Sequence, residues 1–254
     1  MRIVLFADNY IGLKVIEILN SHNENIVGMF VHPTEHQNLY NEIVEASRLP
    51  PELIHPIAKD WNDESIKKLK ALMPDIVLVV FWKYILPEKV FKIPPLGCIN
   101  FHMGYLPYNR GKKPNVWPII DSSPCGISMH YIDEGIDSGE IISQKKVEVD
   151  LIDTGQTIYE KMIDAFPPLF EKTWKKLKDK KIETIKTQEE GTFHLDKEFE
   201  KLNEINLEEK VFPLDLINHL RAKTFPPYPP AYFIKDGKKI FVSINLELDN
   251  FYHE

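Results

Sequence analysis

The sequence predicts an α/β protein with a Rossmann-like, doubly wound and mostly parallel sheet, followed by a small C-terminal subdomain that contains a β-hairpin. In the first part of the chain, short apolar runs of strand length alternate with segments of helical periodicity, which is typical of βαβ units. Residues 76–81 are apolar at every position, as expected for a central parallel strand covered on both faces. Near the C-terminus, Asp236-Gly237 separates two apolar runs, and this dipeptide favours a tight hairpin turn.

The elements of the first half follow from the spacing of apolar residues. Strands are predicted where apolar residues are continuous, and helices where they recur every three or four positions. The third helix should stop before Pro74, because proline cannot continue a helix. The predicted elements are strands at 3–7, 26–31 and 76–81 and helices at 12–20, 36–49 and 64–72.

The second half should extend the sheet and then change character near residue 185. A helix is expected from about Gln156, capped by Asp153 or Thr154, and Pro167-Pro168 should kink or break it. We therefore predict a main domain over 1–185 and a small C-terminal subdomain over 186–254. The other predicted elements are strands at 98–102, 126–131 and 141–149, short strands or loop at 182–188 and 191–194, a polar linker at 202–211, a helix at 214–222 and the hairpin strands 232–234 and 240–242.

Composition and charge disfavour several classes of protein. The net charge of -7 argues against a general nucleic-acid binder, which usually presents a basic face. Cys98 and Cys125 match no metal-ligand spacing and no disulfide framework. Met1 leads directly into an apolar strand rather than a signal peptide, and no apolar run approaches the roughly 20 residues that span a bilayer. We expect a cytoplasmic protein with no metal, no membrane association and no nucleic-acid partner.

A set of polar residues lies where two predicted strands end. Successive side chains of a strand alternate between its faces, so Asn100 and His102 should point the same way. His130 and Asp137 follow from the next predicted strand and its loop. An amide and an imidazole with a carboxylate nearby can stabilise an oxyanion and move a proton, which favours acyl transfer. The alternatives are a polar pair that satisfies the edge of the sheet, and a core histidine at 130 with a backbone partner.

The first predicted strand-to-helix turn, residues 6–12, lacks the glycine pattern that cradles a dinucleotide. A bound dinucleotide is therefore not expected, although the predicted sheet is Rossmann-like.

Several motifs occur in register around these polar residues. They are Asn100-Phe101-His102, Leu106-Pro107, Arg110-Gly111, Pro114-Asn115, His130, and Asp137-Ser138-Gly139-Glu140-Ile141-Ile142. Together they resemble the formyltetrahydrofolate-dependent formyltransferases over roughly the first 180 residues. Arg221 and the segment Phe225-Pro226-Pro227-Tyr228-Pro229 are most similar to the nucleotide-sugar N-formyltransferases of bacterial surface-polysaccharide pathways.

The resemblance implies a reaction and its catalytic residues. A formyl group would pass from N10-formyltetrahydrofolate to the amine of a nucleotide-linked amino-dideoxy sugar, such as dTDP-4-amino-4,6-dideoxyglucose or a close relative, for O-antigen biosynthesis. Asn100 would donate its amide to the oxyanion. His102 would donate when protonated or accept the amine proton when neutral. Asp137 would either orient that imidazole or take the proton itself, and both routes stay open.

The resemblance also implies two binding regions. The flat pterin of the folate would lie between the segment Tyr84-Ile85-Leu86 and the loop that begins with Ile132 and Asp133. Without the resemblance, Ile85 and Leu86 would be core residues and Asp133 a turn former.

The acceptor requires cations for a diphosphate and an aromatic platform for a base. Lys83 follows the central strand, and Arg110 lies with Lys112 and Lys113 in the loop after His102, so Lys83 and Arg110 are the candidates for the first role. Phe225 and Tyr228 are the candidates for the second role, with Tyr232 as a further aromatic candidate. The alternative for the aromatic residues is a hairpin core or a dimer contact. Lys112 and Lys113 are expected to be solvated surface charges. The apolar hairpin strands need a partner surface, so we expect a homodimer.

Three other functions were weighed. Methionyl-tRNA formylation would favour a longer, basic C-terminal domain, whereas this chain is acidic. A purine-pathway formyltransferase would be shorter and would lack the Phe-Pro-Pro-Tyr-Pro segment. A non-catalytic folate- or nucleotide-binding module could share the fold, but it would not need Asn100, His102 and Asp137 together.

Overall fold

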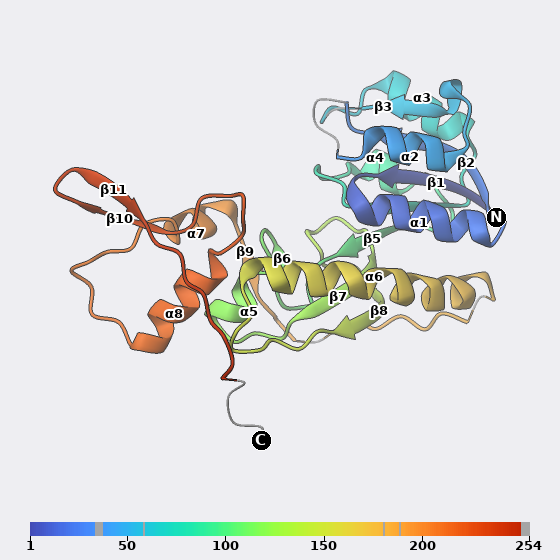
Figure 1. The fold of residues 1–254 in the computed structure, drawn as a ribbon. Helices are drawn as coiled ribbons and strands as arrows, with labels where there is room; N and C mark the ends of the chain where they lie inside the picture. Colours follow the sequence, from blue (N-terminus) through green and yellow to red (C-terminus); the bar gives the residue numbers. More distant parts are fainter. Residues whose placement is uncertain (34–37, 58, 180, 188, 250–254) are drawn as a thin grey trace. The chain divides into compact units, whose positions relative to one another are not determined.

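The computed structural model describes residues 1–33, 38–57, 59–179, 181–187 and 189–249 of the 254-residue chain (Figure 1). Contacts divide it into two compact units that interleave along the sequence. The first unit comprises Met1–His102, Ser128–Gln144 and Phe166–Gln188, and the second comprises Met103–Ile127, Lys145–Ala165 and Glu189–Glu254. The predicted boundary near residue 185 divides the sequence into two consecutive segments, whereas these units are each made of three segments. The boundary stays a prediction.

The predicted sheet is confirmed. It has seven strands in the order β3-β2-β1-β4-β5-β7-β8. The pairs from β3 to β5 are parallel, and β7 pairs with β5 in the antiparallel direction. The predicted strand 76–81 ends one residue early because Phe81 adopts a left-handed φ of 56°. The strands are β1 (Arg2–Ala7), β2 (Asn25–Val31), β3 (Ile54–Pro56), β4 (Ile76–Val80), β5 (Cys98–His102), β7 (Gly126–Tyr131) and β8 (Ile141–Lys146).

The helices between these strands begin at polar caps. Asp8 caps α1 (Asn9–Ser21) by accepting from the backbone of Asn9. Asn62 caps α3 (Asp63–Ala71) by accepting from the backbone of Ser65. The weaker predicted helix over 36–49 is α2 (Tyr40–Ser47), and residues 36 and 37 of that prediction lie outside the described residues. The remaining helices of this part are α4 (Glu88–Phe91) and the second half of α6 (Gly155–Lys178).

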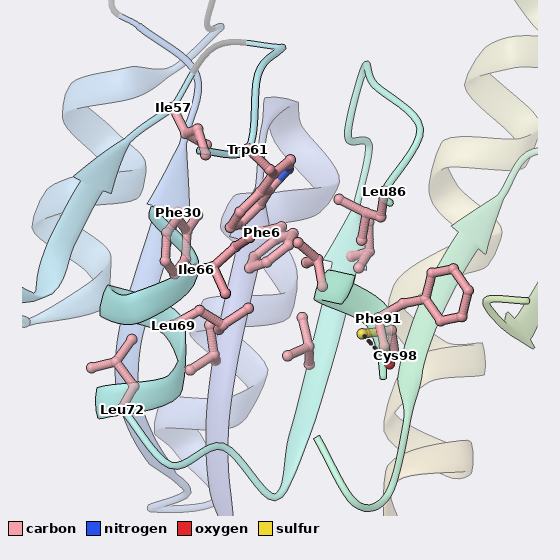
Figure 2. Close-up of a cluster of buried hydrophobic side chains, with 14 of the residues drawn as sticks. Phe6, Phe30, Ile57, Trp61, Ile66, Leu69, Leu72, Leu86, Phe91 and Cys98 are labelled. Atoms are coloured by element: carbon pink, nitrogen blue, oxygen red, sulfur yellow. Dashed lines mark hydrogen bonds between the residues drawn. The ribbon is translucent and has the colours of Figure 1, made fainter. Parts of the chain in front are cut away.

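An aromatic and aliphatic core packs between the sheet and α3 and α4 (Figure 2). The ring of Trp61 lies 5.2 Å from those of both Phe6 and Phe30. At the other side of this core, the Cys98 thiol donates to the carbonyl of Phe91 over 3.6 Å. Burial raises the pKa of the Cys98 thiol to about 12, so this cysteine is a packing residue.

Of the kink or break predicted at Pro167-Pro168, the break is wrong, because α6 continues to Lys178; the kink stays a prediction. Phe166, Phe170 and Trp174 recur at a spacing of four and are completely buried. Each such side chain contributes about 1.5–3 kcal/mol, so the three together are comparable with a cost of about 3 kcal/mol for each of the two prolines inside the helix.

The second unit contains short elements and the hairpin. The antiparallel pair β10 and β11 confirms the predicted hairpin, and Asp236 and Gly237 both adopt positive φ, 50° and 70°, as its two-residue turn requires. The predicted strand 141–149 ends at Lys146, because a turn closed by the bond from Asp150 N to the Asp153 carboxylate (2.6 Å) follows. The elements are β6 (Arg110–Gly111), α5 (Trp117–Ile120), β9 (Phe193–His194), α7 (Asp196–Lys201), α8 (Pro213–Ala222), β10 (Tyr232–Lys235) and β11 (Lys238–Phe241).

Candidate active site

Four polar residues meet at one end of the sheet in the first unit. Asn100 and His102 come from β5, His130 from β7, and Asp137 from the loop that follows β7. The antiparallel register of β5 and β7 sets Asn100 directly opposite His130, so strand pairing brings these two side chains together. The four side chains that were expected to lie together therefore do so in the structure.

The amide of Asn100 is held by two acceptors. Its Nδ2 lies 3.1 Å from Nε2 of His130 and donates to Oδ1 of Asp137 over 3.2 Å. A flipped amide would place its oxygen against the carboxylate, so electrostatics fixes this orientation. Both N–H groups of Asn100 are thus occupied before any substrate binds.

These contacts also fix the tautomer of His130. Its Nδ1 lies 2.8 Å from the carbonyl oxygen of Tyr131, which can only accept, so Nδ1 carries the hydrogen. Nε2 is then the acceptor for Asn100. The ring is 2% exposed, so His130 is a core histidine with a backbone partner and also the group that anchors the Asn100 amide.

The carboxylate of Asp137 lies between the two imidazoles. Its Oδ2 is 3.4 Å from Nδ1 of His102, and its Oδ1 is 3.5 Å from Nε2 of His130. The side chains of His102 and Asp137 are 7% and 14% exposed, so the pair is shielded from bulk water. A carboxylate at Nδ1 orients an imidazole and stabilises its protonated form.

The loop that carries Asp137 is built by its own side chains. Oδ1 of Asp133 accepts from Gly135 N over 3.0 Å and from the Ser138 hydroxyl over 2.7 Å. A Cβ at Gly139 would lie 1.9 Å from the carbonyl oxygen of Tyr131, so only glycine permits this path. Asp137 itself has φ 50°, a conformation that aspartate tolerates better than most residues. The Asp133 side chain therefore shapes the loop, and its predicted contact with the folate stays a prediction.

The residues predicted to line a folate pocket differ in exposure. Tyr84 is half-buried, and the ring of His32 meets it edge-on at 5.3 Å. Ile85 is 74% exposed, whereas Leu86 is 5% exposed and belongs to the core in Figure 2. Ile132 packs against that same core. Ile85 is thus the apolar side chain open to a flat ligand, and Leu86 could reach one only through its backbone.

Lys83 meets an acidic partner that the sequence analysis missed. Its Nζ lies 3.2 Å from Oδ2 of Asp8, which is 2% exposed. The same carboxylate accepts from the backbone of Asn9 and of Asn38 through Oδ1. An aspartate in the first strand-to-helix turn was the available signal for a buried cap. Lys83 neutralises this carboxylate, and its predicted role at a diphosphate stays a prediction.

The other predicted acceptor residues belong to the second unit. Nη2 of Arg110 donates to the carbonyl of Glu190 over 3.3 Å. The ring of Phe225 meets Tyr159 and Tyr228 edge-on at 5.4 and 5.6 Å, and Tyr228 is 68% exposed. In the hairpin, the Tyr232 ring lies under Nζ of Lys239. Lys112 and Lys113 are exposed, as predicted. The exposed ring of Tyr228 is the most open of the proposed platforms.

Three further observations on the described residues bear on metal binding, cavities and membrane spans. The described residues contain no group of three histidine, cysteine or acidic side chains arranged for a metal ion. A cavity of about 730 Å³ lies at the opposite, amino-terminal edge of the sheet, beside Asp75 and Pro95. Among the described residues, none of the helices combines the length and apolar character that crossing a membrane requires.

Comparison with known families gives two matches on this chain. The Formyl transferase model matches residues 1–172, which contain all four clustered polar residues. The N-formyltransferase dimerization C-terminal domain model matches residues 198–248, which contain α8 and the hairpin.

The similar proteins include enzymes that are named for different acceptors. The dTDP-4-amino-4,6-dideoxyglucose formyltransferase of Mycobacterium bovis is 32% identical over 174 residues, which cover 68% of this chain and 74% of that protein. The methionyl-tRNA formyltransferase of Thermodesulfovibrio yellowstonii is 37% identical over 182 residues, which cover 70% of this chain and 56% of that protein.

Solved structures share the whole fold. A 4-N formyltransferase from Francisella tularensis superposes with a TM-score of 0.84 at 31% identity, over 97% of this chain and 98% of that one. WlaRD, a sugar 3N-formyl transferase crystallised in the presence of dTDP and 5-N-formyl-THF, superposes with a TM-score of 0.69 at 19% identity, over 94% of this chain and 84% of that one. At 19% identity, the similarity to WlaRD supports the fold alone.

Proposed function

The chain belongs to the formyl transferase family, and on that premise we propose that it formylates the amine of a nucleotide-linked amino sugar with N10-formyltetrahydrofolate as the donor. The family resemblance stated from the motifs is confirmed, and the chain is a sugar N-formyltransferase by homology. Within that class we propose dTDP-4-amino-4,6-dideoxyglucose or a close relative as the acceptor, the substrate that names the Mycobacterium bovis relative. A role in O-antigen biosynthesis and a cytoplasmic location stay predictions.

The match over residues 198–248 is the main reason to propose a sugar acceptor in place of methionyl-tRNA. It assigns this C-terminal part of the chain to the dimerization domain of N-formyltransferases, and the superposition with the Francisella enzyme covers 97% of this chain. The methionyl-tRNA relative is more identical locally, but the match spans just over half of that protein. Methionyl-tRNA is therefore the control substrate rather than the proposed one.

The clustered residues suggest how the reaction is catalysed. The donor supplies an electrophilic formyl carbon, and attack by the amine creates an oxyanion and an ammonium. We assign the proton to His102, whose Nδ1 faces Asp137 so that Nε2 is the nitrogen that accepts it. Asp137 stabilises the resulting imidazolium. When the oxyanion collapses to the amide, the bond between the formyl carbon and N10 breaks, and the imidazolium returns the proton to N10 so that tetrahydrofolate leaves. The sequence left open whether Asp137 orients the His102 imidazole or takes the amine proton itself. This assignment gives Asp137 the first role.

Asn100 can stabilise the oxyanion only by exchanging a partner, because both of its N–H groups are occupied. The partner to be exchanged is Asp137, because its carboxylate becomes paired with the imidazolium as the reaction proceeds. We therefore assign the N–H that leaves Asp137 to the oxyanion. His130 keeps the other N–H and acts as a positioning residue.

The residues present fit a flat, partly apolar donor. Ile85 offers an exposed apolar side chain, and Tyr84 offers a half-buried ring beside it in sequence. Ile132 and Asp133 begin the loop that presents Asp137. We propose that Tyr84, Ile85 and the 132–133 backbone hold the pterin.

We also propose a homodimer formed through the C-terminal region. The hairpin exposes Ile234, Ile240 and Phe241, which are 50%, 41% and 52% exposed. Apolar strands of this kind need a covering surface, and the family match over this region is a dimerization domain.

A formyl-transfer assay tests the proposed function. Purified protein is incubated with N10-formyltetrahydrofolate and a panel of dTDP- and UDP-linked amino sugars, with methionyl-tRNA as a control, and release of tetrahydrofolate is followed. We expect turnover with a dTDP-linked amino sugar. Turnover with methionyl-tRNA alone would overturn the sugar assignment, and turnover with none, in folded protein that binds folate, would overturn the enzyme reading.

A further inference from the structure

Two lysines of the second unit lie against the same aromatic ring. Nζ of Lys223 is 3.7 Å from the centre of the Phe199 ring, and Nζ of Lys113 is 5.3 Å from it. Lys113 follows β6, Phe199 lies in α7, and Lys223 follows α8. Three segments that are far apart in the sequence therefore converge here.

Lys223 is held in place and is almost completely buried. The residue is 6% exposed, and its Nζ donates to Oδ1 of Asn203 over 2.7 Å. Asn203 is itself fixed, because its backbone carbonyl accepts from Tyr232 N over 2.8 Å at the start of the hairpin. Burial, and then the neighbouring charge of Lys113, lower the pKa of Lys223 to about 8.

Neither of these lysines forms an ion pair with any carboxylate of the described residues. The chain has 38 acidic against 31 basic residues, so acidic partners are abundant. Lys161 in the same unit, by contrast, is paired with carboxylates. Its Nζ lies 2.9 Å from Asp150 and 2.7 Å from Asp153, and although burial lowers its pKa, these hydrogen bonds raise it overall.

We propose that Lys113 and Lys223 form a binding site for a phosphate-type oxyanion. An ammonium has three donors and no acceptor, and the Asn203 amide takes one donor of Lys223. Two neighbouring cations without a counter-ion repel each other, and burial of one of them increases the cost. A phosphate would accept the remaining hydrogens and neutralise both charges. This inference goes beyond the proposed function, because it requires no particular acceptor sugar.

Binding of inorganic phosphate to the full chain tests the site. Affinity is measured by titration calorimetry at constant ionic strength for the wild type and for Lys113→Met and Lys223→Met. The matched control is Lys239→Met, because Nζ of Lys239 also lies over a ring, that of Tyr232 at 3.9 Å, but on the exposed hairpin. We expect each of the first two variants to weaken phosphate binding at least about tenfold and the control to bind as the wild type does.

Two further arms make the result decisive. Lys113 is exposed, so its variant reports on the site even if Lys223→Met does not fold. A parallel titration with dTDP distinguishes the source of the phosphate. Joint weakening of phosphate and dTDP supports a nucleotide-borne group, and weakening of phosphate alone supports a free anion. Absence of phosphate binding in the wild type, or equal binding in all variants, would overturn the proposal.

Discussion

Replacing His130 by leucine separates the positioning of Asn100 from the chemistry of His102. Leucine is apolar and fills much of the volume of a ring that is 2% exposed, but it cannot accept the 3.1 Å hydrogen bond from the Asn100 amide. One neutral hydrogen bond contributes about 0.5–1.5 kcal/mol, which corresponds to about a two- to thirteen-fold change in rate. We expect kcat to fall within that range.

The same change should also lower stability. The buried N–H of Asn100 loses its partner, which costs about 1–3 kcal/mol, and the Tyr131 carbonyl loses the 2.8 Å bond from Nδ1. Urea denaturation measures this loss directly. KM for both substrates should stay close to that of the wild type, because neither substrate is expected to touch this ring.

His130→Gln is the matched control. The glutamine carbonyl can reach the region of Nε2 and accept from Asn100, so most of kcat should return even though the contact with Tyr131 is lost. The assay is steady-state release of tetrahydrofolate with each variant confirmed to be folded. Wild-type kcat in the leucine variant, or equal losses in the leucine and glutamine variants, would refute the positioning role.

Three other predictions follow from the same structure. Asp137→Asn should lower kcat about 10²- to 10⁴-fold with little change in KM, since it removes the carboxylate that stabilises the protonated His102; a rate near wild type would exclude that role. The pKa of Lys223 is about 8 in the folded state against 10.5 in the unfolded chain, so the unfolded chain binds more protons between these values and the folded protein should gain stability as the pH rises from 8 to 10.5. Urea denaturation across this range should show a rise in the free energy of unfolding that Lys223→Met lacks. The same pH dependence in the wild type and the variant would contradict this. Ile240→Glu should shift the protein toward monomer in sedimentation experiments, because it places a charge on an exposed apolar hairpin strand; Lys238→Glu on the same strand is the control, and an unchanged dimer in the Ile240 variant would place the interface elsewhere.

Local sequence patterns were sufficient for much of the fold. The continuous apolar run at β4 and the Asp236-Gly237 turn both predicted elements that the structure confirms. In both cases the pattern reflects burial or a backbone angle that the residues themselves specify. The break predicted within α6 was wrong because Phe166 and Phe170 pack on Phe101 of β5 and, like Trp174, are completely buried, and helix propensity alone does not report tertiary packing.

The candidate site shows the same limit. Alternation along one strand predicted that Asn100 and His102 share a face, and the structure brings them together with Asp137. The contact between His130 and Asn100 depends on the register of β5 and β7, and the pairing of Lys83 with Asp8 joins the ends of two strands that are distant in sequence. Such contacts depend on topology, so single-residue patterns could not predict them.

The burial of both cysteines has a practical consequence for labelling the protein. Cys125, like Cys98, is buried, and burial raises the pKa of each thiol to about 12. At pH 8 only about one in 10⁴ of these thiols is the reactive thiolate. A single cysteine placed at the exposed position of Tyr228 should therefore react with maleimide dyes against a nearly silent background. A fluorophore could thus be attached at this exposed position without prior removal of the native thiols.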